Sequence, residues 1–170
     1  TERSISTEHL IRVADRPSTV KTRIIAHNQH VARVDHEMAK AFSEDDESRL
    51  MDMVLGQIDR SKAVVISDYA KGVVSESLVQ NAIIEAKTRG IPVIVDPKGK
   101  DYTKYRGATV LTPNRKEATE ACNLEDSDSA VDESGRKLLD LLEVEAVLIT
   151  QGEDGMTLFT SEAESVRFPA

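Results

Sequence analysis

Val93-Ile94-Val95-Asp96-Pro97-Lys98 is a short run of consecutive apolar residues that ends in a turn with charged side chains. Similar apolar runs occur at Ala63-Val64-Val65-Ile66, at Thr109-Val110-Leu111 and at Ala146-Val147-Leu148-Ile149. Strands that are apolar on consecutive residues are typical of a parallel sheet that is covered on both faces. We therefore expect these four runs to be buried parallel strands.

Helices are predicted between these strands. Residues 44–58 place apolar side chains on one helical face, Ser75 is positioned to cap a second helix, and Gly90 is positioned to end it. Another helix carries Leu138, Leu139, Leu141 and Leu142. Strands that alternate with helices indicate right-handed βαβ crossovers, so the predicted fold class is α/β, a parallel sheet flanked by helices over residues 44–170.

Two hairpins are also predicted. Residues 19–26 and 30–35 are β-branched stretches on either side of the polar turn His27-Asn28-Gln29, which favours an antiparallel hairpin over residues 19–35. Residues 156–160 and 165–168 suggest a closing hairpin at the end of the chain. We find no linker that would separate a second domain, so residues 1–170 are expected to form a single, incomplete domain.

The composition excludes several classes of protein. The chain has 170 residues and a formal net charge of −8, and it has no clustered basic face that would suit nucleic acid or an anionic membrane. The single cysteine, Cys122, cannot form a disulfide within the chain and is expected to pack in the core. No apolar run is long enough for a membrane helix, and residues 1–10 do not resemble a signal peptide. A reducing cytoplasm fits best.

Polar residues follow every predicted parallel strand. They occupy residues 67–72, 96–100, 112–117 and 150–155 and include carboxylates, lysines and glycines. Ligands of open α/β sheets bind beyond the carboxyl ends of the strands, where such loops converge. Carboxylates suit a metal-bound polyphosphate or a sugar hydroxyl, lysines neutralise phosphate, and glycines let backbone N–H groups approach an anion. The pattern predicts a polar, phosphorylated ligand.

The first two loops also have a purely structural interpretation. Asp68 could cap the turn before the helix at Ser75, and Lys71 and Gly72 could be ordinary turn residues. Asp96 followed by Pro97 is a favoured turn initiator.

The last two loops have structural alternatives as well. Asn114 followed three residues later by Glu117 matches a capping box, which needs no ligand. Lys98 could simply be solvated, and Gly152 and Gly155 are the kind of residue expected in a turn between strands. The chain has neither a Gly-x-x-x-x-Gly-Lys-Ser/Thr phosphate loop nor a Gly-x-Gly-x-x-Gly fingerprint, which disfavours P-loop and dinucleotide-binding proteins.

Taken in order, the strand-end loops resemble the middle of a ribokinase-like sugar kinase. The resemblance rests on Ser67-Asp68-Tyr69-Ala70-Lys71-Gly72, Asp96-Pro97-Lys98, Thr112-Pro113-Asn114-Arg115-Lys116-Glu117 and Thr150-Gln151-Gly152-Glu153-Asp154-Gly155. Within that family, residues 16–29 are most similar to the heptose 7-phosphate kinases of lipopolysaccharide-core synthesis, which occur alone or fused ahead of an adenylyltransferase. The resemblance implies an ATP- and Mg²⁺-dependent kinase that phosphorylates the anomeric hydroxyl of a phosphorylated sugar.

The resemblance also implies roles on the nucleotide side. Asn114 and Glu117 match the family's Asn-x-x-Glu motif and would organise Mg²⁺ through water, a role compatible with capping because a helix N-terminus is itself an anion site. Lys98, beside Asp96, would face the phosphates. The nucleotide-side turn would contain Gly152 and Gly155.

On the substrate side, the resemblance implies that Asp68 and Lys71 line the cleft near the reacting groups. The predicted hairpin resembles the family's substrate-side lid, where Lys21 or Arg23 would hold the sugar phosphate. The substrate-side residues implied on it are Lys21, Arg23, Arg33 and Asp35. Two elements of the family have no match in this sequence, an early Gly-Gly substrate-binding element and a late Gly-Ala-Gly-Asp loop that holds the general base. We therefore expect the base beyond Ala170 and this chain to be an internal piece, inactive alone.

Two other functions remain open. The chain could be a non-catalytic binding module that forms a homodimer through the hairpin, because unpaired strand edges recruit partners. It could also be a ribokinase-like kinase for another sugar.

Overall fold

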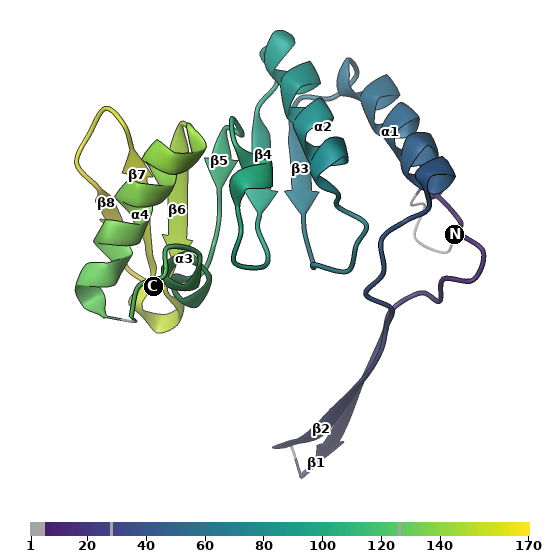
Figure 1. The fold of residues 1–170 in the computed structure, drawn as a ribbon. Helices are drawn as coiled ribbons and strands as arrows, with labels where there is room; N and C mark the ends of the chain where they lie inside the picture. Colours follow the sequence, from purple (N-terminus) through teal and green to yellow (C-terminus); the bar gives the residue numbers. More distant parts are fainter. Residues whose placement is uncertain (1–5, 28, 126) are drawn as a thin grey trace.

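The computed structural model describes residues 6–27, 29–125 and 127–170, and within them it forms a six-stranded sheet and a separate two-stranded hairpin (Figure 1). Neighbouring strands of the larger sheet follow the order of the sequence. The parallel strands are β3 (Val64–Ser67), β4 (Val93–Asp96), β5 (Val110–Leu111) and β6 (Ala146–Thr150), and the antiparallel strands are β7 (Met156–Thr160) and β8 (Val166–Phe168). The predicted α/β sheet and its closing hairpin are confirmed.

The helices begin where the sequence places capping residues. They are α1 (Glu44–Ile58), α2 (Glu76–Thr88), α3 (Arg115–Ala121) and α4 (Asp128–Leu142), with the 3₁₀ turns η1 (Thr103–Tyr105) and η2 (Gly152–Asp154). The Ser75 hydroxyl accepts a hydrogen bond from the Leu78 N–H at 3.1 Å, and Gly90 follows α2 with a φ of +66°. No helix in the described parts of the chain is long and apolar enough to cross a membrane.

The core lies between one face of the sheet and the helices. Helix α2 packs on β4, and α4 packs on β6 and β7. Val95, Leu111 and Val147 have no exposed surface. The prediction that the strands are buried on both faces is wrong for the opposite face at β3. Val65 is 70% exposed there, and no described residue covers it.

The hairpin consists of β1 (Val20–Ala26) and β2 (Gln29–His36) and projects away from the sheet near the end of β3 (Figure 1). Asn28, in the predicted turn, lies outside the described residues. Residues that lie opposite each other in an antiparallel pair share a face. The pairs Lys21–Asp35 and Arg23–Arg33 therefore form a charged face, and the alternate face carries Val20, Ile24, Ala32 and Val34.

The parallel register brings the polar strand ends to one edge of the sheet. Ser67 pairs with Asp96 across β3 and β4, and Leu111 pairs with both Val95 and Val147. A further bridge joins Asn114 to Thr150. This edge, from Ser67 to the turn after Thr150, is called the strand-end rim below.

Candidate functional site

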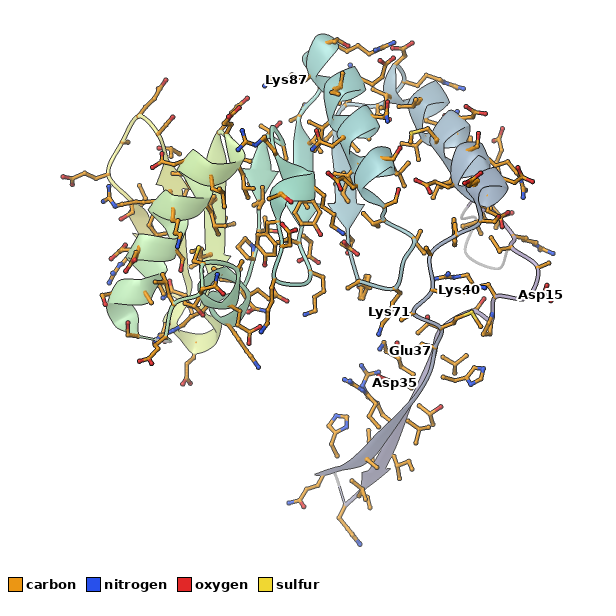
Figure 2. All side chains as sticks on the ribbon, viewed as in Figure 1. Asp15, Asp35, Glu37, Lys40, Lys71 and Lys87 are labelled. Atoms are coloured by element: carbon orange, nitrogen blue, oxygen red, sulfur yellow. The ribbon has the colours of Figure 1, made fainter. Side chains whose placement is uncertain are left out.

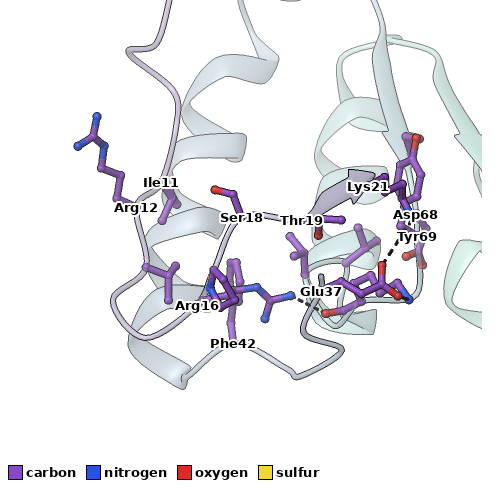
Figure 3. Close-up of a pocket in the computed structure, with 16 residues that line it drawn as sticks. Ile11, Arg12, Arg16, Ser18, Thr19, Lys21, Glu37, Phe42, Asp68 and Tyr69 are labelled. Atoms are coloured by element: carbon purple, nitrogen blue, oxygen red, sulfur yellow. Dashed lines mark hydrogen bonds and ion pairs between the residues drawn. The ribbon is translucent and has the colours of Figure 1, made fainter. Parts of the chain in front are cut away.

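A cavity of about 1100 Å³ opens beside the end of β3, between the loop that follows this strand and the base of the hairpin (Figure 3). Three predicted substrate-side residues line it: Lys21, Asp68 and Lys71. Asp35 contacts Lys21 from the same hairpin face. Arg23 and Arg33 are not among the lining residues, although they extend the charged face away from the core.

Glu37 joins the two lysines of this cavity. Its Oε1 lies 2.5 Å from the Lys71 Nζ and its Oε2 lies 3.6 Å from the Lys21 Nζ. Figure 2 shows Asp35, Glu37 and Lys71 along the same side of the hairpin base. The hydrogen bond from Lys71 lowers the pKa of Glu37 against the opposing effect of burial. Glu37 was not predicted as a site residue, and it partly neutralises both cations.

Arg16 fastens the segments that lead into and out of the hairpin. Its guanidinium donates hydrogen bonds to the carbonyl oxygens of Lys40 at 2.5 Å and Lys71 at 2.6 Å, and it lies 4.9 Å from the Phe42 ring centroid. Gly72, with a φ of +80°, lies so close that a Cβ would collide with the Lys40 carbonyl. The base of the hairpin is therefore held against the loop after β3.

Asp68 is a buried carboxylate with three hydrogen bonds. Its Oδ2 accepts from the Lys104 Nζ at 2.5 Å and from the Tyr105 hydroxyl at 2.7 Å, and its Oδ1 accepts from the Ala70 N–H at 2.7 Å. Burial alone raises the pKa of Asp68, but these hydrogen bonds outweigh it and leave the pKa below its ordinary value. The structural interpretation, a turn cap, is confirmed by the Ala70 contact. The sequence had not indicated Lys104 or Tyr105.

The phosphate-side residues form a second cluster. The Lys98 Nζ lies 2.6 Å from the Glu117 Oε1, and this hydrogen bond raises the pKa of Lys98. The Glu117 Oε2 accepts from the Asn114 N–H at 3.0 Å, and the Asn114 side chain accepts from the Glu117 N–H at 2.9 Å. The predicted capping box of α3 is therefore confirmed.

The two clusters touch through Tyr105 and continue along the strand-end rim. The Lys98 N–H donates to the Tyr105 hydroxyl at 3.4 Å, and the Ser67 hydroxyl donates to Asp96 at 3.4 Å. The structure thus brings Asp68, Lys98 and Asn114 together at one edge, as predicted.

The turn after β6 adds the two predicted glycines to this edge. Gly152 and Gly155 have φ values of +63° and +82°, which favour glycine. A Cβ at Gly155 would collide with the Phe168 carbonyl, whereas one at Gly152 would meet open space. Gly155 is therefore needed for close packing against the Phe168 carbonyl, whereas no neighbouring atom lies close to the side of Gly152.

The donor set at Asn114 and Glu117 suits Mg²⁺ held through water rather than directly. Both carboxylate oxygens of Glu117 already have partners, and no group of three or more metal-ligating side chains occurs among the described residues. Mg²⁺ keeps several waters and is commonly held by one or two carboxylates together with substrate phosphates. Glu117 and Asn114 fit that outer role.

Parallel strands with cations, carboxylates and glycines at one rim, beside a lid-like hairpin, define an α/β domain whose candidate site lies beyond the strand ends. The sequence model described as "pfkB family carbohydrate kinase" matches residues 1–170. The chain belongs to the pfkB family of carbohydrate kinases.

Curated relatives match almost the whole chain. The protein named "Bifunctional protein HldE" from Geobacter sulfurreducens is 40% identical over 168 residues, which are 98% of this chain and 34% of that protein. The protein of the same name from Wolinella succinogenes is 42% identical over 169 residues, 97% of this chain and 35% of that protein. The chain thus spans about one third of the length of the curated relatives it matches.

Solved structures support the fold. Phosphofructokinase-2 from Escherichia coli, in complex with potassium, aligns with a TM-score of 0.71 at 21% identity, covering 91% of this chain and 50% of that one. Ribokinase from Arabidopsis thaliana, complexed with ribose and ATP, aligns with a TM-score of 0.64 at 17% identity, covering 91% of this chain and 49% of that one. The expected ribokinase-like architecture is confirmed.

Proposed function

We propose that these 170 residues are the part of a heptose 7-phosphate kinase that holds the sugar phosphate and the phosphates of Mg·ATP. The observation that carries the proposal is the continuous polar edge that runs from the lysines of the cavity, Lys21 and Lys71, to Lys98 and Glu117. Curated relatives named HldE, similar over nearly the whole chain, and the resemblance of residues 16–29 favour a heptose phosphate over other sugars.

The proposed chemistry needs positioning and charge neutralisation from this chain. The anomeric hydroxyl of the sugar attacks the γ-phosphorus of Mg·ATP, the bond to the β-phosphate oxygen breaks to release ADP, and the hydroxyl proton passes to the general base. Lys98 offsets charge on the nucleotide phosphates, while Asn114 and Glu117 hold the waters of Mg²⁺. The general base is expected outside these residues, so phosphoryl transfer requires a complete pfkB domain.

The charged hairpin face suits the 7-phosphate of the sugar. Arg23 and Arg33 lie directly opposite each other, and like charges in that position repel; the Asp35 carboxylate, whose Oδ1 lies 3.1 Å from the Arg33 Nε, offsets part of this charge. Lys21 lies two pairs closer to the core, on the same face of the hairpin, and also lines the cavity. A phosphate held between the hairpin and Lys71 would relieve this repulsion.

Titration of the chain with heptose 7-phosphate and with Mg·AMP-PNP is expected to release binding heat with both ligands. Glu37→Gln is expected to bind heptose 7-phosphate severalfold more tightly, because it removes a solvent-accessible ion pair that competes for Lys71 and Lys21. The glutamine can still accept a hydrogen bond from Lys71. Affinity for Mg·AMP-PNP is expected to stay unchanged.

Glu162→Gln, in the β7–β8 loop, is the matched control because it makes the same charge change far along the chain from the cavity residues. Absence of heat from both ligands would contradict the proposed function. Heat with the nucleotide, together with tighter binding of fructose 6-phosphate than of heptose 7-phosphate, would instead indicate a kinase for another sugar.

The hairpin supports a second proposal, a homodimer through its apolar face. Val20, Ile24 and Val34 are 54%, 48% and 57% exposed on this face. Exposed strands with apolar side chains pair readily with another copy. Ile24→Lys is expected to convert a concentration-dependent dimer into a monomer in sedimentation velocity.

Ile84→Lys is the control for this substitution, since Ile84 is 59% exposed on α2 and lies outside the hairpin. The dimer is expected to persist in that variant. A wild-type chain that stays monomeric at all concentrations, or a dimer that survives Ile24→Lys, would contradict the hairpin interface.

A further inference from the structure

Tyr105 lies where the two halves of the candidate site meet, and with the contact between the Ser67 hydroxyl and Asp96 it joins them through a side chain. Its hydroxyl donates to the Asp68 Oδ2 at 2.7 Å and accepts from the Lys98 N–H at 3.4 Å. Asp68 follows β3 on the sugar side, whereas Lys98 follows β4 on the phosphate side. Tyr105 itself belongs to η1, seven residues after Lys98 in the connection between β4 and β5, and from there its hydroxyl reaches Asp68 in the loop after β3.

The ring of Tyr105 is held rigidly from behind. It is fully buried and packs edge to face against Tyr102, with ring centroids 5.7 Å apart. The backbone of η1 is fixed to α2, because the Gln80 Nε2 donates to the Lys104 carbonyl at 2.9 Å and to the Arg106 carbonyl at 3.2 Å. Tyr105 therefore presents its hydroxyl from a fixed position to both loops.

Lys104 reinforces only the sugar-side half of this arrangement. Its Nζ donates to the Asp68 Oδ2 at 2.5 Å and to the Val74 carbonyl at 3.2 Å. Asp68 in turn holds the Ala70 N–H, one residue before Lys71. The orientation of the loop that carries Lys71 thus depends on Asp68, and the orientation of Asp68 depends on η1.

We propose that Tyr105 and Lys104 are positioning residues: they fix the Asp68 carboxylate, and with it the loop of Lys71, and Tyr105 couples this loop to the backbone of Lys98. This inference deepens the proposed function, on which its ligand-binding consequence rests. Tyr105 and Lys104 touch neither ligand in this proposal. Their effect is transmitted through Asp68 and through the Lys98 N–H.

Amide hydrogen exchange of the whole chain tests the coupling without any ligand. Tyr105→Phe is expected to speed exchange at the Ala70 and Lys98 amides by roughly ten-fold or more, because a hydrogen bond to a charged group is lost at Asp68 and the Lys98 N–H loses its acceptor. Lys104→Met is expected to speed exchange at Ala70 but not at Lys98. The exchange rate at the Lys98 amide therefore distinguishes the role of Tyr105 from that of Lys104, even if one variant is less stable.

Tyr102→Phe is the matched control, since the buried Tyr102 hydroxyl has no hydrogen-bond partner among the described residues. Its exchange at Ala70 and Lys98 is expected to equal that of the wild type. Unchanged exchange at both amides in Tyr105→Phe would overturn the proposal. A uniform acceleration that includes the amides of β6 would also overturn it, because it would reflect overall destabilisation alone.

Calorimetry supplies the ligand-binding readout. Tyr105→Phe is expected to weaken both heptose 7-phosphate and Mg·AMP-PNP several-fold, whereas Lys104→Met weakens heptose 7-phosphate alone and Lys104→Arg restores it. If the wild type binds neither ligand, the proposed function fails and the exchange experiment still decides the coupling. If the wild type binds both and Tyr105→Phe binds them equally well, the positioning role is refuted.

Discussion

Replacing Asp68 by alanine is expected to lower the free energy of unfolding of this chain by about 3 kcal/mol. The substitution removes the acceptor for Lys104, Tyr105 and the Ala70 N–H in a place where the Asp68 side chain is only 2% exposed. Removing one partner of a buried ion pair leaves the other charge without compensation. The expected loss is at the lower end of the range for such changes, because the Lys104 side chain is 22% exposed and can reach water.

Urea unfolding followed by circular dichroism measures this loss. Asp59→Ala provides the control, since Asp59 is an exposed carboxylate whose ion pair with Arg89 lies on the surface, where such pairs contribute little to stability. The double variant Asp68→Ala/Lys104→Met is expected to recover part of the stability by removing the stranded cation. A loss below about 1 kcal/mol for Asp68→Ala would show that the cluster is not a structural anchor.

The cluster of Asp68, Lys104 and Tyr105 also makes the free energy of unfolding depend on pH. Because its folded pKa is depressed below the ordinary value of 3.8, ionised Asp68 contributes stability that is fully present above that value. This contribution is lost as the pH falls below 3.8 and through the lower pKa of the folded state. Asp68→Asn should flatten this part of the stability profile, while the acid sensitivity due to Asp35 and Glu37, whose pKa values are also lowered, remains.

The meeting of the strand ends could be predicted because parallel strands impose it. Once apolar runs mark β3, β4, β5 and β6 as parallel, the residues after each run must lie at one edge of the sheet. Asp68, Lys98 and Asn114 do lie there, and the capping box at Asn114 and Glu117 was visible in the spacing alone. Local rules and sheet topology therefore sufficed for this part of the candidate site.

The partners of these residues could not be predicted in the same way. Lys104 and Tyr105 lie in a single 3₁₀ turn, which has neither the period of a helix nor that of a strand, and they reach Asp68 across 36 and 37 residues of sequence. Glu37 and Arg16 act at the hairpin base through contacts that depend on where the hairpin folds back onto the loop after β3. Such long-range pairs depend on tertiary packing, so no local sequence pattern predicts them.

Burial also changes the interpretation of Asp68. The family resemblance implied that Asp68 lines the cleft near the reacting groups, yet its carboxylate oxygens already accept three hydrogen bonds from the protein. The geometry therefore favours an indirect effect on the substrate, through the loop of Lys71. Direct contact with the sugar stays a prediction, because Asp68 does line the cavity.

Glu117→Gln is expected to reduce turnover roughly 100-fold when these 170 residues stand within a complete pfkB domain, the size of effect seen when a charge-stabilising group is removed from a transition state. The glutamine can still accept the Asn114 N–H, because a capping box works with either Glu or Gln. The start of α3 is therefore retained, and the substitution removes only the charge that would hold the waters of Mg²⁺ and that pairs with Lys98. Turnover measured over a range of Mg²⁺ concentrations should show both the lower rate and a higher Mg²⁺ requirement.

The control for this experiment lies on the same helix. Glu120 is the next glutamate of α3, and its carboxylate lies 3.8 Å from the Lys116 Nζ on the exposed surface. Glu120→Gln makes an identical charge change near the rim and should leave turnover and Mg²⁺ dependence unaltered. Both variants keep the helix intact and lose one negative charge. A difference in turnover between them therefore depends on where the charge was removed. Equal turnover and equal Mg²⁺ dependence in Glu117→Gln and the wild type would remove Glu117 from the phosphate site and leave it with the capping role alone.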